Sequence, residues 1–246
     1  MRRRLRAGFL GRLDYLPAVR LQEQLRAELL EARSAGEVED RAEALLLLEH
    51  PHVYTLGRNA RTQDLRATAD WLVAHGVEVH ETDRGGQVTY HGPGQLVGYP
   101  VVDLAPDRRD LRRYVRDLQE VLIATLASLG VPAFPGAETA AIGVWVDGAR
   151  GREKIASIGV HVKRWITTHG FALNVSTDLE MFGGIVACGL PDVTMTSIAR
   201  VVGFAPALEE IAATVAARFA EVFGRRLEPL TREEALRRVA SAAVGR

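Results

Sequence analysis

The sequence has few of the residues that mark several classes of protein. Cys188 is the single cysteine, so no intrachain disulfide can form, and this usage fits a reducing cytoplasm. No apolar run reaches the ~18 residues that a membrane span requires, and none follows the basic start of the chain as a signal peptide would need. The formal net charge is zero, which gives no electrostatic reason to expect binding to nucleic acid or to a membrane.

Lysine is almost absent as well. Of the 31 basic residues, all but Lys154 and Lys163 are arginine. Arginine keeps its proton in proteins whereas lysine can lose it, so both lysines are candidates for chemistry. We expect Lys163 to be an ordinary exposed residue.

What is present is typical of a folded α/β protein. The 246 residues are 47% hydrophobic and 25% charged, enough for a sizeable core in one large domain or two small ones. Apolar runs predict strands at residues 5–14, 44–49, 77–81, 141–147, 155–163 and 165–175. We expect the first of these, residues 5–14, to be an edge strand of the sheet. Helical periodicity predicts helices at residues 17–35, 68–75, 110–129, 206–223 and 231–242.

The order of these elements predicts the fold class. The pattern Thr231-x-x-Glu234 is typical of a capping box and marks the start of the last helix. No repeat and no linker divides the chain. We therefore expect a single α/β (α+β) domain over residues 1–246, with a mixed or mostly antiparallel sheet flanked by helices.

Residues 83–100, which read DRGGQVTYHGPGQLVGYP, are the most distinctive stretch. Glycine recurs at positions 85, 86, 92, 94 and 98, around polar and aromatic side chains. A plain hairpin needs a single glycine-containing turn, whereas repeated glycines let backbone approach a ligand closely. The composition favours a ligand cleft lined by backbone, and a glycine-rich structural loop is the alternative.

Cys188 is a candidate nucleophile because Gly189, Leu190 and Pro191 follow it and predict a loop. A thiol with an ordinary pKa of ~8.5 is only a few per cent thiolate at neutral pH, so it requires a nearby cation or base. By residue type the candidates are Lys154 and three histidines, His91, His161 and His169. These residues alone do not decide between lysine and histidine.

Two other clusters have simpler interpretations. His50 and His52 flank a proline without a carboxylate or cysteine at ligand spacing, which favours a loop over a metal site. The arginines between positions 108 and 116 are typical of a solvated helix face. The alternative is a docking patch for an acidic partner.

Four separated blocks of this sequence resemble the lipoyl(octanoyl) transferases, which move an octanoyl group from acyl carrier protein to a lysine of a lipoyl domain. They are LEHP with TLGR from residue 48, RGGQVTYHGPGQLVGYP from residue 84, KIASIG from residue 154, and HGFALNV from residue 169 followed by FGGIVACGLPD and Thr196-Ser197. The resemblance covers residues 44 to 200. Ala187 departs from it, since proline is expected before the cysteine.

The resemblance implies a function and a site. Cys188 becomes acylated, Lys154 activates its thiol, and the acyl group passes to the lipoyl-domain lysine without ATP, metal or cofactor. Its implied partners are acyl carrier protein, lipoyl domains of 2-oxoacid dehydrogenase complexes and the glycine cleavage H protein. The implied substrate-binding residues are Arg84, Gly85, Gly86, Gln87, Val88, Thr89, Tyr90, His91, Ser157, Ile158, Gly159, Gly170, Phe171 and Ala172. The implied fold resembles the catalytic domain of biotin and lipoate protein ligases.

Three other functions are considered. An ATP-dependent lipoate or biotin protein ligase would share the fold and form an acyl-adenylate, for which no cysteine nucleophile is needed. A non-catalytic binding module would keep the cleft and lose the nucleophile. A cysteine hydrolase would pass the acyl group to water, which depends on how dry the site is.

Overall fold

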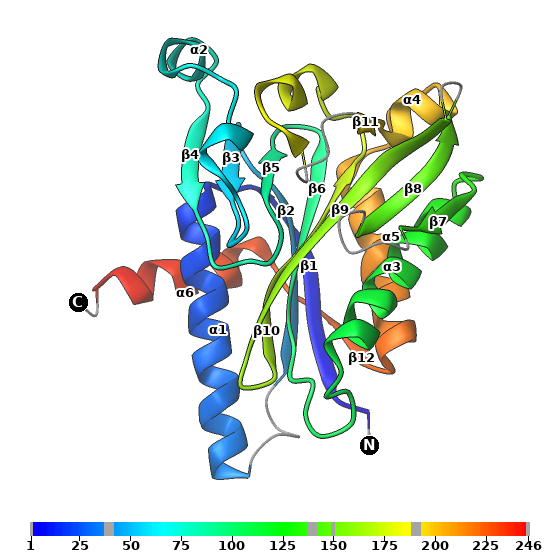
Figure 1. Ribbon diagram of the computed structural model, residues 1–246. Helices are drawn as coiled ribbons and strands as arrows, with labels where there is room; N and C mark the ends of the chain where they lie inside the picture. The colour runs from blue at the N-terminus through cyan, green and yellow to red at the C-terminus, as the bar shows by residue number, and fades with distance from the viewer. Residues whose placement is uncertain (1, 37–41, 137–141, 149–150, 188–192, 245–246) are drawn as a thin grey trace.

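The described part of the chain forms two β-sheets and six α-helices (Figure 1). The computed structural model describes residues 2–36, 42–136, 142–148, 151–187 and 193–244. In spatial order the large sheet contains β12 (Arg226–Pro229), β1 (Arg4–Arg12), β2 (Glu43–Glu49), β6 (Gln95–Val101), β10 (Ile166–Asn174), β9 (Gly151–Lys163), β8 (Gly143–Gly148) and β7 (Ala133–Pro135), with β11 (Thr194–Met195) beside β9. The small sheet contains β4 (Glu78–Glu81), β3 (Val53–Leu56) and β5 (Val88–His91).

The large sheet is mixed, as predicted. Strands β12, β1 and β2 are parallel to one another, and the pairs from β2 through β6, β10, β9 and β8 to β7 are antiparallel. The prediction of β1 as an edge strand is wrong, because β12 pairs with it from Arg4↔Arg226 to Ala7↔Pro229. Strand β12 has only four residues with mostly exposed side chains, so its sequence carries no alternating pattern.

All five predicted helices are present. The helices are α1 (Tyr15–Ala35), α2 (Ala69–Ala74), α3 (Leu111–Ala127), α4 (Ile198–Val202), α5 (Leu208–Phe223) and α6 (Arg232–Val244). The predicted capping box forms: Thr231 N donates to Glu234 at 3.0 Å, and Glu234 N donates to Thr231 Oγ1 at 3.3 Å. Among the described residues, no helix combines the length and the apolar character that crossing a membrane takes.

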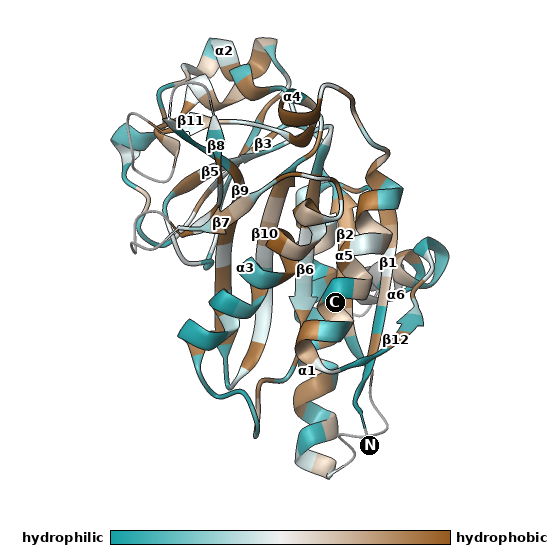
Figure 2. Ribbon diagram, turned by 90° about the vertical axis from the view of Figure 1, so that its right-hand side faces the viewer, coloured by the Kyte–Doolittle hydropathy of each residue, from teal (hydrophilic) through white to brown (hydrophobic). Residues whose placement is uncertain are grey.

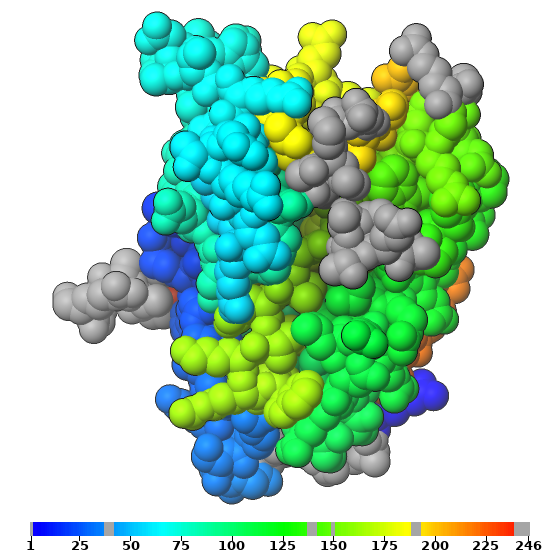
Figure 3. All heavy atoms as spheres, in the orientation of Figure 1, coloured from blue at the N-terminus to red at the C-terminus, as the bar shows by residue number. Residues whose placement is uncertain are grey.

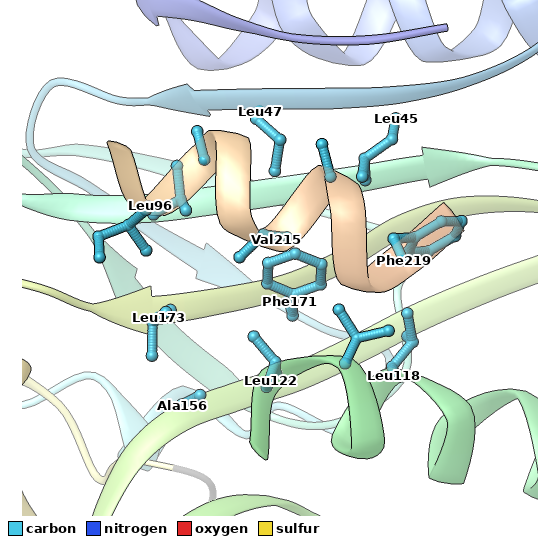
Figure 4. Packing of buried hydrophobic residues seen from close by; sticks show 14 of the residues in the cluster. Leu45, Leu47, Leu96, Leu118, Leu122, Ala156, Phe171, Leu173, Val215 and Phe219 are labelled. Carbon is cyan, nitrogen blue, oxygen red and sulfur yellow. The ribbon is translucent and has the colours of Figure 1, made fainter. Parts of the chain in front are cut away.

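Strand β2 shows why the fold has two hydrophobic cores. Its four consecutive leucines are fully buried, as expected for a strand covered on both faces. Leu45 and Leu47 pack with α3 and α5, while Leu46 and Leu48 pack with α1 and with Ala235 of α6. Figure 4 shows the first core, with α3 and α5 against the sheet. Figure 2 shows that α1 and α3 carry both hydrophilic and hydrophobic residues, as helices that cover a sheet require.

The small sheet has a core of its own. Tyr54, Val88 and Tyr90 pack against Met181 and Phe182 of the 3₁₀ segment η3 (Leu179–Gly184). The glycine-rich stretch connects the two sheets, because β5 belongs to the small sheet and β6 to the large one. The two strands therefore do not form a hairpin with each other, and a ligand-sized space opens beside their junction.

Candidate active site

A cavity of about 480 Å³ lies where the two sheets and α3 meet. Strands β5, β9 and β10, the loop before β5, and the starts of α1 and α3 contribute its walls. In the space-filling view, yellow-green residues of the β9 region are visible between the cyan segment on one side and green α3 on the other (Figure 3). The volume falls within the range of small-molecule sites.

Nearly all of the predicted substrate-binding residues meet at this cavity. Thirteen of the fourteen line it: Arg84, Gly85, Gly86, Gln87, Val88, Thr89, His91, Ser157, Ile158, Gly159, Gly170, Phe171 and Ala172. They come from three segments, of which residues 84–91 lie more than 60 positions before the other two. The antiparallel pairing of β9 and β10 sets Gly159 beside Gly170, and the hydrogen bond from Gly85 N to Val160 O brings the first segment to β9. Their substrate contacts remain a prediction.

Tyr90 is placed elsewhere. Its ring is fully buried in the core of the small sheet, edge-on to Tyr54 and Phe182. Its hydroxyl group lies 2.8 Å from His52 Nδ1. These contacts occupy both the ring and the hydroxyl, so the tyrosine supports β5 rather than the cavity wall.

The loop that contains Gly85 and Gly86 is held on two sides. Three carbonyl groups of the loop accept backbone hydrogen bonds from residues 57–59, at 3.0 to 3.1 Å, and Gly85 N donates to Val160 O of β9 at 2.9 Å. Gly86 has a φ of 87°, which favours glycine, and a Cβ on Gly159 would lie 3.0 Å from Gly85 O. The glycines therefore allow the loop to lie directly against β9.

Arg84 anchors the same loop. Its side chain is buried, and Nε and Nη2 donate to Thr55 Oγ1 of β3 at 3.1 and 2.9 Å. Nη1 donates to Gly85 O at 3.1 Å. The guanidinium thus fixes the loop to the small sheet while it also lines the cavity.

Asp83 joins two histidines at the edge of the site. Its carboxylate accepts from His169 Nε2 at 2.8 Å and lies 3.4 Å from His161 Nε2. The hydrogen bond from His169, together with the charge of the neighbouring residues, lowers the pKa of Asp83 to about 2. His169 itself has a φ of 55°, and its backbone N–H donates to the buried Gln22 Oε1 at 2.7 Å. A non-glycine residue in this conformation is strained and is typical of functional sites.

Two more histidines are buried and uncharged. His50 Nδ1 lies 2.6 Å from Leu13 O, and its Nε2 lies 2.8 Å from the hydroxyl of cavity-lining Tyr99. Burial lowers the pKa of His50 to about 4 and that of His91 to about 3. Of the four candidate activators of a thiol, His161 and His169 contact Asp83, and His91 contacts Gln95.

Lys154 is the fourth candidate and the most deeply buried. It lies on β9 with no exposed surface, and its Nζ is 5.5 Å from the centre of the Trp145 ring. A Cβ on Gly143 would lie 2.6 Å from Lys154 Cε, so the glycine makes room for the lysine. Gly143 follows Ile142, which lines the cavity. Lys154 is not itself a lining residue, and its side chain lies against Gly143, the residue next to the lining residue Ile142.

A β-bulge lies beside this lysine. Trp145 pairs with Lys154 while Val144 pairs with Ala156, so Ile155 is the extra residue. Bulges redirect side chains and are frequent next to active sites. The bulge and the glycine together explain how a strand of the core accommodates a long polar side chain.

Cys188, the predicted nucleophile, lies outside the described residues. Before it, Val186 N donates to Asp64 O at 2.7 Å, and Ala187 is buried in the small-sheet core. After it, Met195 pairs with Lys154, and Thr196 N donates to Lys154 O at 2.9 Å.

Several lining residues had no usable signal in the sequence. Tyr15, Leu111 and Val115 come from the starts of two helices, where they are part of ordinary apolar faces. His169 belonged to a block that resembles the transferases, and its position at the cavity was not predicted. Lys163, expected to be ordinary, is exposed.

No group of three or more histidine, cysteine, aspartate or glutamate side chains that could hold a metal ion occurs within the described part of the chain. The two histidines at positions 50 and 52 instead contact tyrosine hydroxyls and a backbone carbonyl.

The class of protein follows from a family match and a shared fold. Residues 14–220 match the family described as the lipoyl protein ligase A/B catalytic domain. A bipartite lipoate protein ligase from Thermoplasma acidophilum has the same fold, with a TM-score of 0.68 and 18% identity over 100% of this chain and 95% of that one.

Curated relatives narrow the class. The chain is 48% identical to an octanoyltransferase of Solibacter usitatus, over 89% of this chain and 93% of the relative. It is 46% identical to an octanoyltransferase of Chloroflexus aurantiacus, over 95% and 99%. The chain therefore belongs to the lipoyl protein ligase A/B catalytic-domain family and, within it, to the octanoyltransferases, acyltransferases of protein lipoylation.

Proposed function

We propose that this octanoyltransferase works by double displacement through an acyl-cysteine, with Cys188 as nucleophile and Lys154 as the group that activates it. The octanoyl donor is a thioester on the phosphopantetheine arm of acyl carrier protein. The acceptor is a lysine of a lipoyl domain. Residues 1–246 form one catalytic domain, and strands from Arg4 to Pro229 in a single sheet support this.

In the first half-reaction, the sulfur of Cys188 attacks the thioester carbonyl. A bond from the cysteine sulfur to the acyl carbon forms, the bond to the phosphopantetheine sulfur breaks, and the cysteine proton ends on the departing thiol. In this mechanism Lys154 carries that proton, since an amine can accept it and return it. Backbone N–H groups near Gly159 or Cys188 stabilise the oxyanion.

In the second half-reaction, the lysine amine of the lipoyl domain attacks the acyl-enzyme. A carbon–nitrogen bond forms, the carbon–sulfur bond breaks, and the proton lost by the amine ends on the cysteine sulfur. A thioester becomes an amide, which is downhill, so ATP, metal and cofactor are not required.

The observation that carries this proposal is the position of Lys154. A fully buried lysine adjoins a cavity whose walls contain the predicted substrate-binding residues, and the strand that follows the cysteine segment pairs with this same lysine. Activation of a thiol needs a base or a cation near the sulfur, and a buried amine beside the strand that follows the cysteine segment supports Lys154 in that role.

The proposal extends to partners and compartment. The acceptors are the lipoyl domains of 2-oxoacid dehydrogenase complexes and the glycine cleavage H protein. A nucleophilic thiol must stay reduced, which supports a cytoplasmic location.

Intact mass spectrometry tests the proposal. The protein is mixed with octanoyl-acyl carrier protein without ATP, as wild type and as Cys188→Ser and Lys154→Met. We expect wild type to gain one octanoyl group that a lipoyl domain then removes, Cys188→Ser to gain none, and Lys154→Met to react at least ~100-fold more slowly. Lys163→Met, which changes the exposed lysine, is the matched control and should behave as wild type.

The same samples separate the transferase from an ATP-dependent ligase. A ligase would leave wild type unmodified by the thioester, would acylate the lipoyl domain only with octanoate and ATP, and would release pyrophosphate. That result would refute the acyl-cysteine mechanism.

A further inference from the structure

A chain of buried hydrogen bonds runs from the cavity into the large sheet. His91 Nδ1 lies 2.8 Å from Gln95 Oε1. Gln95 Nε2 donates to Tyr90 O at 3.2 Å and to Asn174 Oδ1 at 2.9 Å. Asn174 Nδ2 donates to Thr196 O at 2.9 Å. Gln95 and Asn174 are each 1% exposed, so these hydrogen bonds satisfy the polar atoms of their buried amide groups.

The backbone fixes the direction of every bond in this chain. A backbone carbonyl only accepts, so Thr196 O requires the NH₂ group of Asn174 and leaves Asn174 Oδ1 as an acceptor. Tyr90 O likewise requires the NH₂ group of Gln95. Gln95 Oε1 must then accept, and His91 Nδ1 must donate. Flipping either amide would set an oxygen against a carbonyl oxygen.

A neutral imidazole that donates from Nδ1 carries a lone pair on Nε2. His91 lines the cavity, and within the described residues no group donates to its Nε2. Burial lowers the pKa of His91 to about 3, so the ring stays neutral at physiological pH. His91, a residue of the cavity wall, therefore carries a fixed hydrogen-bond acceptor on Nε2 and not a donor.

We propose that Gln95 and Asn174 are positioning residues that hold His91 in the Nδ1–H tautomer, and that His91 Nε2 accepts a hydrogen bond from the attacking lysine amine of the acceptor domain. This amine is the attacking group of the second half-reaction, and it carries N–H donors. The thioester carbonyl, its oxyanion and the thiolate carry none, and an acceptor would repel the oxyanion. His91 therefore orients the amine in the second half-reaction and is not part of the oxyanion hole. This inference rests on the function proposed above.

Nitrogen-15 NMR of the labelled, full-length protein reads the tautomer directly. His91→Phe identifies the His91 signals by their loss, and exposed His75→Gln is the matched control. We expect a protonated Nδ1 and an unprotonated Nε2 in wild type at pH 7. Gln95→Met, which removes the partner of Nδ1, should mix the two tautomers, an effect that a merely structural residue would not produce.

Single-turnover kinetics locate the role. In His91→Phe and Gln95→Met we expect transfer to the lipoyl domain to slow about tenfold more than acyl-enzyme formation does, which corresponds to the loss of one hydrogen bond in the second half-reaction. A protonated Nε2 in wild type, or equal slowing of both half-reactions in His91→Phe, would overturn the inference. Failure of wild type to form any acyl-enzyme would instead refute the double displacement and with it the role for the amine, while the NMR result would stand separately.

Discussion

Gly143→Ala is the substitution that most directly tests whether the position of Lys154 matters. Gly143 has a φ of 147°, a conformation that residues with side chains rarely adopt. An added Cβ would lie 2.3 Å from Ala156 O, 2.6 Å from Lys154 Cε and 3.3 Å from Lys154 Nζ. The substitution therefore displaces the Lys154 side chain together with the adjoining backbone of β9, and it leaves the chemistry of the amine unchanged.

The size of the effect follows from these distances. Lys154 Cε must move by about 0.8 Å, the difference between 2.6 and 3.4 Å, to reach ordinary contact. Displacements of about 1 Å at a reacting centre cost up to ~10²-fold in rate, so we expect acyl-enzyme formation to slow by roughly 10- to 100-fold. The strained backbone costs about 1–3 kcal/mol of stability, and the overpacking costs about 1–3 kcal/mol more.

Gly130→Ala separates backbone strain from displacement of the lysine. Gly130 also has a positive φ, 73°, but no described atom lies within 4 Å of the place that its Cβ would take. Urea unfolding gives the stability of both variants, and intact mass against time gives the rate of acylation per folded molecule. Acylation by Gly143→Ala at the wild-type rate, with Gly130→Ala as control, would refute the role of Lys154.

Three further expectations concern acid stability, docking and chain length. The pKa of His50 is near 6.5 in the unfolded chain and about 4 in the folded chain, because burial disfavours the charged form. The stability that the neutral His50 contributes is therefore complete above pH 6.5 and is lost as the pH falls toward 4. Urea unfolding should show a loss of up to ~1.4 kcal/mol per pH unit in that window, and a smaller one in His50→Gln. Arg112 and Arg116 are exposed beside the cavity-lining face of α3. Changing both to glutamate should raise KM for octanoyl-acyl carrier protein about tenfold and leave KM for octanoyl-pantetheine unchanged. The same KM for the carrier substrate in wild type and in this variant would exclude docking at these arginines. In Gly98→Ala the new methyl group meets the ring of Phe171, which lines the cavity, and the preference should shift from octanoyl toward hexanoyl thioesters in a competition assay.

The elements that were predicted well are those whose signal is local. The leucines of β2, the amphipathic face of α3 and the capping box at Thr231 each depend on a few neighbouring residues, and each is present. Strand β12 was missed because its pairing with β1 is a contact between residues more than 200 positions apart. The same distance explains why β1 was placed at the edge.

The candidate site divides along the same line. The recurring glycines indicated a ligand cleft, and the resemblance of four sequence blocks to the lipoyl(octanoyl) transferases implied acyl transfer. Residue types alone could not decide whether a lysine or a histidine activates the thiol, because the partners of a side chain come from distant strands; Lys154 was implied only by the resemblance. In the structure, Asp83 binds two of the histidines, and the third contacts Gln95.

The sequence alone indicated the family, five of the helices, part of the large sheet and most residues around the cavity, because each of these depends on local pattern. Tertiary structure alone decided that Tyr90 supports β5, that Gly143 makes room for Lys154, and that His91 Nδ1 contacts Gln95 Oε1. Those outcomes depend on burial and hydrogen-bond direction, which arise only when the two sheets and their helices pack together.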